Sequence, residues 1–152
     1  MSKINSEDVS IRVLRSDDFS AIVEIDSMVG KQARPQYYER KLRRLTDSSE
    51  QIVSSLVAEH EGRVVGFLMG EVFHGEFGIP ESQATIDTIG VDPRAQRSGI
   101  AKMLFEEFVT NMKAIGVTSI RTLVNWNDFS LAGFFSKVGF FPTPVLNLEL
   151  NI

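Results

Sequence analysis

The chain has no cysteine among its 152 residues. Disulfide bonds, thiolate nucleophiles and zinc sites with cysteine ligands are therefore excluded. A chain without disulfides suits a reducing compartment, so we expect a cytoplasmic protein. The two histidines, His60 and His74, lie apart in the sequence without an acidic partner at ligand spacing, so we expect no metal site.

Long apolar runs are also missing. No stretch approaches the ~20 consecutive apolar residues that a membrane-spanning helix needs. The first ten residues are polar and carry both charge signs, whereas a secretory signal requires an apolar core there. We therefore expect no membrane partner and no secretory leader.

An excess of positive charge is the third absence. Lys and Arg number 16 against 20 Asp and Glu, which gives a formal net charge of −4. Because nucleic-acid affinity comes largely from Lys and Arg that neutralise phosphates, we expect no nucleic-acid partner. The one basic run, residues 40–44, is interpreted as a solvated helix face, with a contact to an acidic partner or ligand as the alternative.

What the sequence does contain is enough apolar content, 43% of its residues, for one compact core. It shows no repeats or linkers, so we expect a single domain over residues 1–152. Helices are predicted from apolar residues spaced three and four apart, at 22–29, 35–45, 98–115 and 126–138. Strands are predicted from β-branched and alternating runs, at 11–14, 55–59, 64–73, 84–91, 119–124, 140–141 and 145–150. This order predicts an α/β (α+β) fold, with a mixed, mostly antiparallel sheet of six to seven strands flanked by about four helices.

The most informative segment is the turn between the predicted strand 84–91 and the predicted helix 98–115. A strand that enters a helix through small residues leaves backbone N–H groups unpaired, with the positive end of the helix dipole behind them. Such a turn is suited to bind phosphate. Gly99 has no Cβ, so the backbone can approach a ligand closely. The nucleoside-triphosphatase loop and the dinucleotide fingerprint, which also bind phosphate, are absent from the sequence.

Three short motifs in order resemble one family. They are Gln96-x-x-Gly99-x-Ala101 in the turn, the strand from Ile86 to Pro93 before it, and Phe135-Ser136-Lys137-Val138-Gly139-Phe140 downstream. Together they resemble the GNAT superfamily of acyl-CoA-dependent N-acetyltransferases, over residues 11 to about 150. The resemblance implies a GNAT-like fold with splayed central strands. It also implies transfer of the acetyl group of acetyl-CoA to a primary amine of a small molecule or peptide, by direct attack in a ternary complex.

The resemblance further implies where acetyl-CoA (coenzyme A) is bound. The backbone amides of residues 97–101 would hold the pyrophosphate, and three cations, Arg94, Arg97 and Lys102, would screen its charge. The backbone of Ile89 and Val91 would pair with the pantetheine arm, and one of their amides would act as an oxyanion site. A bulge at Gly90 would help to separate the strands. The predicted cofactor-binding residues are Ile89, Val91, Gln96, Arg97, Ser98, Gly99, Ile100, Ala101, Lys102, Asn127, Asp128 and Phe135.

Acetyl transfer also needs a base, because amines with a pKa of ~8 to ~10.4 are mostly protonated at neutral pH. Asp87, on the strand where some relatives keep an acidic residue, and Glu71, on the preceding strand, are the candidate catalytic residues. Since strand side chains alternate, Asp87 is expected on the opposite face of the sheet from Ile86 and Thr88. The alternative interpretation is that both carboxylates are merely solvated or capped on a half-exposed strand.

The sequence departs from the family's pattern at three places. Phe135 stands where many relatives have a tyrosine close to the departing sulfur, and it has no proton to give. Asp128 stands where relatives commonly have an asparagine that contacts the cofactor, with Asn127 as a neighbouring alternative. Leu123 replaces a glutamate common in protein N-terminal acetyltransferases, which argues against activity on ribosomal proteins. Phe135 favours an alternative function, an acyl-CoA-binding sensor or regulatory module with a degenerate catalytic site.

Two further expectations concern packing. Four aromatic residues near the predicted last helix are expected in the core: Trp126, Phe129, Phe134 and Phe135. Residues 145–150 alternate between apolar and polar side chains, so they are predicted to form a strand that is able to pair across a homodimer.

Overall fold

Within residues 3–30, 34–47 and 54–152, which the computed structural model describes, one mixed sheet has five strands in the order β1-β2-β3-β4-β5. The strands are β1 (Val9–Val13), β2 (Ser55–His60), β3 (Arg63–His74), β4 (Ser82–Val91) and β5 (Ser119–Thr122). Neighbours are antiparallel except β4 and β5, which are parallel. The predicted mixed, mostly antiparallel α/β fold is confirmed.

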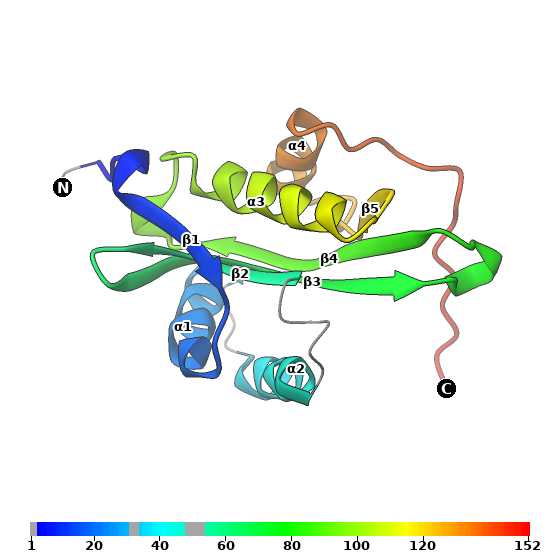
Figure 1. Cartoon of the computed structure of the whole chain (residues 1–152), viewed down its shortest axis with the longest axis horizontal. Helices are drawn as coiled ribbons and strands as arrows, with labels where there is room; N and C mark the ends of the chain where they lie inside the picture. The colour runs from blue at the N-terminus through cyan, green and yellow to red at the C-terminus, as the bar shows by residue number, and fades with distance from the viewer. Residues whose placement is uncertain (1–2, 31–33, 48–53) are drawn as a thin grey trace.

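Helices cover both faces of the sheet (Figure 1). The helices α1 (Phe19–Gly30) and α2 (Pro35–Asp47) lie on one face, and α3 (Ile100–Ala114) and α4 (Phe129–Lys137) lie on the other. The predicted start of α2 at Pro35 is confirmed, because the fixed φ of proline suits the first helical position. No helix in the described ranges is long and apolar enough to cross a bilayer.

The strand β3 lies at the centre of the core because both of its faces are covered. Phe67 and Met69 pack beneath α1 and α2, in a cluster that includes Tyr38. Leu68 points to the opposite face and belongs to a cluster with Leu104 of α3. A strand that is buried on both faces has a nearly continuous apolar sequence, which is why this strand could be predicted without alternation.

Two glycines allow side chains to approach the sheet more closely than a Cβ would permit. A Cβ on Gly70 would lie 2.6 Å from Cε2 of Phe108 and 2.8 Å from the carbonyl oxygen of Ser54. A Cβ on Gly90 would lie 2.8 Å from Cε1 of Phe67. The expected bulge at Gly90 is wrong, because Gly90 pairs in regular register with Phe67. The glycine there makes room for the Phe67 ring.

Two predicted strands are not formed in the described structure. Residues 140–141 and 145–150 have no strand partner, and residues 141–152 are exposed throughout. The sheet of the described residues therefore has five strands where six to seven were predicted. A period-two pattern identifies the apolar face of a strand, but it does not supply the edge against which the strand pairs.

The packing of α4 corrects a second expectation. Trp126 and Phe129 are 87% and 76% exposed, so the prediction that they lie in the core is wrong. The inward face of α4 is instead set by residues spaced three and four apart. They are Leu131, Phe134, Phe135 and Val138. Trp126 precedes the helix, and Phe129 lies off that face.

Replacing Gly70 with alanine is expected to destabilise the protein by about 1–3 kcal/mol, because the new Cβ overlaps the Phe108 ring and the Ser54 carbonyl. The matched control is Gly133→Ala in α4, where a Cβ would meet nothing within 4 Å. Alanine favours a helix over glycine by up to about 1 kcal/mol, so the control is expected to be neutral or stabilising. Urea unfolding measures both; a Gly70→Ala protein as stable as the parent would contradict the packing.

Candidate functional site

The turn between β4 and α3 has an unusual backbone. After Val91 the chain makes a short 3₁₀ turn over Pro93–Ala95, and α3 begins only at Ile100. Two residues on the way, Arg97 and Gly99, have φ values of 65° and 80°. A positive φ is uncommon for a residue other than glycine and is found where function demands a strained turn. The helix therefore starts two residues later than predicted, directly after the left-handed Gly99.

The N–H groups of this turn are free to bind a ligand. The first hydrogen bond of α3 runs from the Met103 N–H to the Gly99 carbonyl, at 3.0 Å. Within the described part of the chain, no acceptor is found for the backbone N–H groups of residues 97–102. Gly99 is exposed, and a Cβ placed on it would meet nothing within 4 Å. The turn thus presents unpaired donors beside open space at the positive end of a 15-residue helix.

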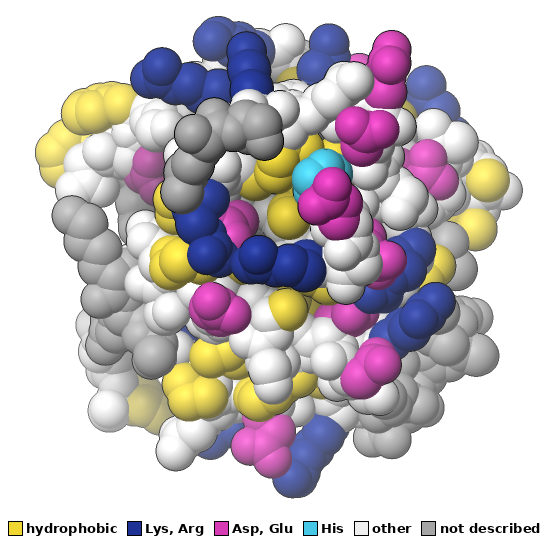
Figure 2. Space-filling model, turned by 90° about the vertical axis from the view of Figure 1, so that its left-hand side faces the viewer, with side chains coloured by type: hydrophobic (Ala, Val, Ile, Leu, Met, Phe, Trp, Pro, Cys, Tyr) yellow, Lys and Arg dark blue, Asp and Glu magenta, His cyan; other side chains and the backbone are white. Residues whose placement is uncertain are grey.

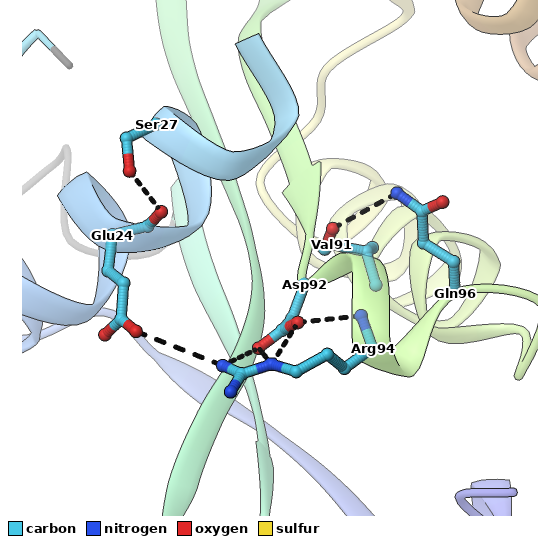
Figure 3. A network of polar contacts seen from close by, with 6 residues as sticks. All are labelled: Glu24, Ser27, Val91, Asp92, Arg94 and Gln96. Carbon is cyan, nitrogen blue, oxygen red and sulfur yellow. Dashed lines mark hydrogen bonds and ion pairs between the residues drawn. The ribbon is translucent and has the colours of Figure 1, made fainter. Parts of the chain in front are cut away.

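An ion pair between the buried Asp92 and the half-exposed Arg94 lies at the base of the turn (Figure 3). The Asp92 N–H donates to the Val65 carbonyl of β3 at 2.8 Å. The Asp92 carboxylate accepts from the N–H of Arg94 at 2.8 Å and from its guanidinium at 2.7–3.2 Å. The guanidinium also lies 4.0 Å from Glu24 of α1. Arg94 is therefore engaged on the α1 side, and the expectation that it screens a phosphate is not supported.

This ion pair is maintained at neutral pH. The Arg94 guanidinium lowers the pKa of Asp92 below its ordinary value, against the opposing effect of burial. The stability that the Asp92 charge contributes is therefore fully present above the unfolded-state pKa of about 3.9. It is lost only as the pH falls through the lowered value in the folded state.

Of the remaining side chains of the turn, two donate hydrogen bonds to backbone carbonyls, one is exposed and one is buried. The Gln96 amide donates to the Val91 carbonyl at 3.4 Å and so ties the turn back to the end of β4 (Figure 3). The Ser98 hydroxyl donates to the Ala95 carbonyl. Lys102, one turn into the helix, is exposed and lies 3.7 Å from Glu106. Ile100 is buried in the core, so only its backbone can serve the turn.

One edge of β4 is open over its second half. The parallel pairing with β5 runs from Gln83 opposite Ser119 to Ile86 opposite Thr122, whereas β4 continues to Val91. No strand of the described structure pairs with that edge beyond Ile86.

The open edge exposes the backbone of two predicted residues. Because the Asp92 N–H bonds to β3, and because backbone groups alternate between the two edges of a strand, Gly90 also faces β3. Ile89 and Val91 therefore direct their N–H and C=O groups toward the open edge. The contact from Gln96 to the Val91 carbonyl agrees with this orientation.

A bulge places Asp87 in an unexpected orientation. Met69 pairs with Thr88, and Gly70 pairs with Ile86, so Asp87 is the extra residue of β4. The predicted alternation is broken here. Ile86 packs in the core on the α3 side, but Asp87 and Thr88 both contact α2, since Lys41 donates to Asp87 and the Tyr37 and Thr88 hydroxyls lie 3.3 Å apart.

The two candidate bases share one small cavity. Asp87 and Glu71 line it together with Lys41 and Arg44 of α2. The Asp87 side chain is 24% exposed, so it lies within reach of solvent. The role of Lys41 was missed because residues 40–44 were interpreted as a solvated face; Lys41 lies one helical turn after Tyr37, on the face that meets β4.

Three predicted cofactor-binding residues lie in or just before α4. Two of them, Phe135 and Asp128, make contacts within the protein. Phe135 is 3% exposed, and its ring packs 5.4 Å from that of Phe134 and 4.9 Å from that of Phe140. Asp128 accepts from the Leu131 N–H at 3.1 Å and caps α4. Asn127 is exposed before the helix.

Elsewhere on this end of the molecule, charges of both signs are mixed. Figure 2 looks onto the end that carries the β2–β3 turn and the start of α3, and Lys and Arg side chains lie there beside Asp and Glu side chains. Arg12, for example, binds Asp18 at 2.7 Å and Glu59 at 2.8 Å. Within the described residues, no group of three His, Asp or Glu side chains is arranged to hold a metal ion. The backbone turn before α3 is therefore the anion site that the geometry favours.

Comparison with known proteins agrees with this geometry. The sequence profile of the acetyltransferase (GNAT) family matches residues 12–140. A comparison with curated protein sequences returned no match.

Solved structures share the fold over nearly the whole chain. A transcriptional regulator from Bacillus halodurans C-125 is similar with a TM-score of 0.78 and 19% identity, covering 95% of this chain and 99% of that one. An aminoglycoside acetyltransferase from an uncultured soil metagenomic sample gives 0.74 and 16%, covering 97% and 98%. A ribosomal-protein-alanine N-acetyltransferase from Brucella melitensis biovar Abortus 2308 gives 0.73 and 16%, covering 95% and 99%. Because the family profile spans well over half of the sequence and the fold is shared along it, the chain belongs to the acetyltransferase (GNAT) family.

Proposed function

We propose that this protein transfers the acetyl group of acetyl-CoA to a primary amine. The observation that carries the proposal is the arrangement of a single strand, β4. Its open edge runs from Asp87 to Val91, about 13 Å at the usual rise per residue, and leads directly into the unpaired amides of residues 97–101. A donor with a diphosphate at one end and a reactive carbonyl at the other suits such an edge.

The chain offers separate groups for binding and for chemistry. Acetyl-CoA supplies an acyl group activated as a thioester. The N–H groups of residues 97–101 hold the diphosphate, and the open-edge N–H groups of Ile89 and Val91 bind the pantetheine arm. One of these two N–H groups stabilises negative charge on the reacting oxygen, since a fixed donor in place before the reaction needs no reorganisation.

Asp87 acts as the base that receives a proton from the amine. Its partner Lys41 occupies the carboxylate in the absence of an acceptor. An incoming ammonium group replaces Lys41 at the same oxygen atoms, so the acceptor enters between α2 and β4. Glu71, in the same cavity, is the second candidate for this role. Two of the structurally similar proteins are an aminoglycoside acetyltransferase and a ribosomal-protein-alanine N-acetyltransferase, so aminoglycosides and peptides with alanine are among the amines to test.

A second candidate function follows from Phe135. Its buried ring provides no proton for the departing thiolate, and the Lys41 contact occupies the Asp87 carboxylate. These two observations support the second candidate, an acyl-CoA-binding sensor or regulatory module. A thiol with a pKa of ~8.5 is a tolerable leaving group with solvent as proton donor, so acetyl transfer remains our first proposal. Acetyl-CoA that raises the melting temperature while no amine releases thiol would establish the sensor.

Gly99→Ala is expected to weaken coenzyme A binding by about tenfold or more, because its Cβ enters the space in front of the turn amides. The matched control is Gly116→Ala at the other end of α3. Gly116 has a φ of 84°, close to the 80° of Gly99, and its Cβ would also meet nothing within 4 Å. Both variants carry the same backbone strain, so calorimetry with coenzyme A separates strain from obstruction. Equal affinity for the two variants would contradict the phosphate assignment.

Asp87→Asn is expected to lower turnover by about 10²- to 10⁴-fold with unchanged affinity for acetyl-CoA, because the amide cannot accept the amine proton. Thiol release from acetyl-CoA with a panel of polyamines, amino acids, aminoglycosides and peptides measures this. Glu107→Gln, an exposed carboxylate on α3, is the control with the same charge change. Full turnover in Asp87→Asn together with its loss in Glu71→Gln would transfer the role to Glu71.

A further inference from the structure

Two of the four cations in the run at residues 40–44 of α2 have no partner within the part of the chain that the structure describes. Arg43 binds Glu39 at 2.8 Å, and Lys41 binds Asp87 of β4. The guanidinium groups of Arg40 and Arg44 make no ion pair or hydrogen bond with any described residue. They are four positions apart, where like charges on a helix repel each other. An unbalanced positive charge therefore lies on α2, in a protein whose formal net charge is −4.

These two arginines line a groove beside the candidate base. The groove has a volume of about 300 Å³. Its lining is one face of α2, formed by Gln36, Tyr37, Arg40, Lys41 and Arg44. Lys41 and Arg44 also line the small cavity that contains Asp87 and Glu71. The groove and the cavity therefore adjoin, and a ligand with one group at Asp87 extends directly into the groove.

The groove is suited to an anionic group. A guanidinium group presents a planar fork of N–H donors that matches a carboxylate or a phosphate. Four residues of a helix rise about 6 Å, so the long side chains of Arg40 and Arg44 are able to converge on one anion. Both residues are exposed, so an anion reaches them from solvent. An anion between them would also relieve their mutual repulsion.

The ion pair of Lys41 and Asp87 gives an independent reason to expect two opposite charges on the acceptor. The two side chains are only 21% and 24% exposed, so leaving either charge unpaired is costly. In the proposed reaction, the ammonium group of the acceptor takes the place of Lys41 at Asp87. A purely cationic acceptor would leave Lys41 unpaired. An acceptor that also carries an anion gives Lys41 a new partner, so one ion pair within the protein is exchanged for two with the acceptor.

We propose that the acceptor is a primary amine that also carries an anionic group, a carboxylate or a phosphate, within a few bonds of its nitrogen. The ammonium group binds Asp87, and the anionic group binds Lys41 together with Arg40 and Arg44. This inference rests on the proposed acetyl transfer and narrows its acceptor to one chemical class. It disfavours polyamines and aminoglycosides, which bring only positive charge to a groove that already has three cations.

The reaction itself removes one of the two charges that hold the acceptor. One proton of the ammonium group passes to Asp87, and the neutral nitrogen bonds to the acetyl carbon as the carbon–sulfur bond breaks. The second proton of the nitrogen reaches the departing thiolate through solvent, and Asp87 then releases its own proton to solvent. The product amide has no positive charge, so it no longer competes with Lys41 for Asp87. Return of Lys41 to Asp87 therefore favours release of the product.

Thiol release from acetyl-CoA with matched acceptors tests the proposal. Each of a panel of amino acids is compared with its carboxamide, and O-phosphoethanolamine is compared with ethanolamine. The anionic member of a pair is expected to have a kcat/KM about 10- to 100-fold higher, because it alone bonds to the cations of α2. The amino acids report on a carboxylate and the ethanolamine pair on a phosphate. Neutral members that react as well as the anionic ones would overturn the anionic class and leave acetyl transfer standing, whereas thiol release from no acceptor would overturn both.

Arg44→Gln tests the residues that the proposal assigns. It is expected to lower the preference for the anionic member of a pair about tenfold, through a higher KM for that member. A merely structural role of Arg44 would change both members of the pair alike. The control with the same charge change is Arg63→Gln, an exposed arginine at the start of β3 outside the lining of the groove and the cavity, which is expected to keep the preference. An unchanged preference in Arg44→Gln, or an equal loss in Arg63→Gln, would overturn the proposal.

Discussion

The structure depends on one helix that begins without a cap. A helix leaves its first N–H groups without partners, and a side chain at the N-cap commonly satisfies one of them at a gain of about 1 kcal/mol. The protein follows this rule at α4, which Asp128 caps, but α3 starts at Gly99 with no side-chain cap. The longest helix of the described structure thus keeps its donors unpaired at a turn that is otherwise firmly anchored. We interpret this uncapped end of α3 as the binding position of the ligand, whose anionic oxygens accept hydrogen bonds from the unpaired N–H groups.

Two ion pairs, each between a buried carboxylate and a half-exposed arginine, hold the parts of the site in register. Asp92 joins the turn to β3 through the Val65 carbonyl and binds Arg94, which also lies 4.0 Å from Glu24 of α1. Directly before α2, Arg34 donates to Asp26 of α1 at 2.7 and 3.0 Å, which holds the start of the helix that carries Lys41 opposite β4. Tyr38 packs against this pair, and burial raises its pKa, so its hydroxyl stays neutral. The helices α1 and α2, on one face of the sheet, are therefore fixed to each other and to the end of β4.

The sequence predicts the parts of this frame that depend on local chemistry. The apolar spacing of α3, the continuous run of β3 and the proline start of α2 all follow from patterns within one element. The Asp87 bulge does not, because the register of β4 is set by its pairing with β3, and a one-residue shift changes which side chains face α2. The same limit explains Lys41, whose importance comes from a strand 46 residues away in the sequence. It also explains residues 145–150, whose alternation is that of a strand although no partner strand lies beside them in the described structure.

The central claim is that the backbone amides of residues 97–101 bind a diphosphate. Amide chemical shifts of the ¹⁵N-labelled protein test it directly, with coenzyme A compared against pantetheine, which has the same arm without the diphosphate. We predict large shifts at residues 97–101 with coenzyme A, and shifts confined to the open edge of β4 with pantetheine. Unchanged resonances at residues 97–101 with coenzyme A, or the same shifts there with both compounds, would contradict the account.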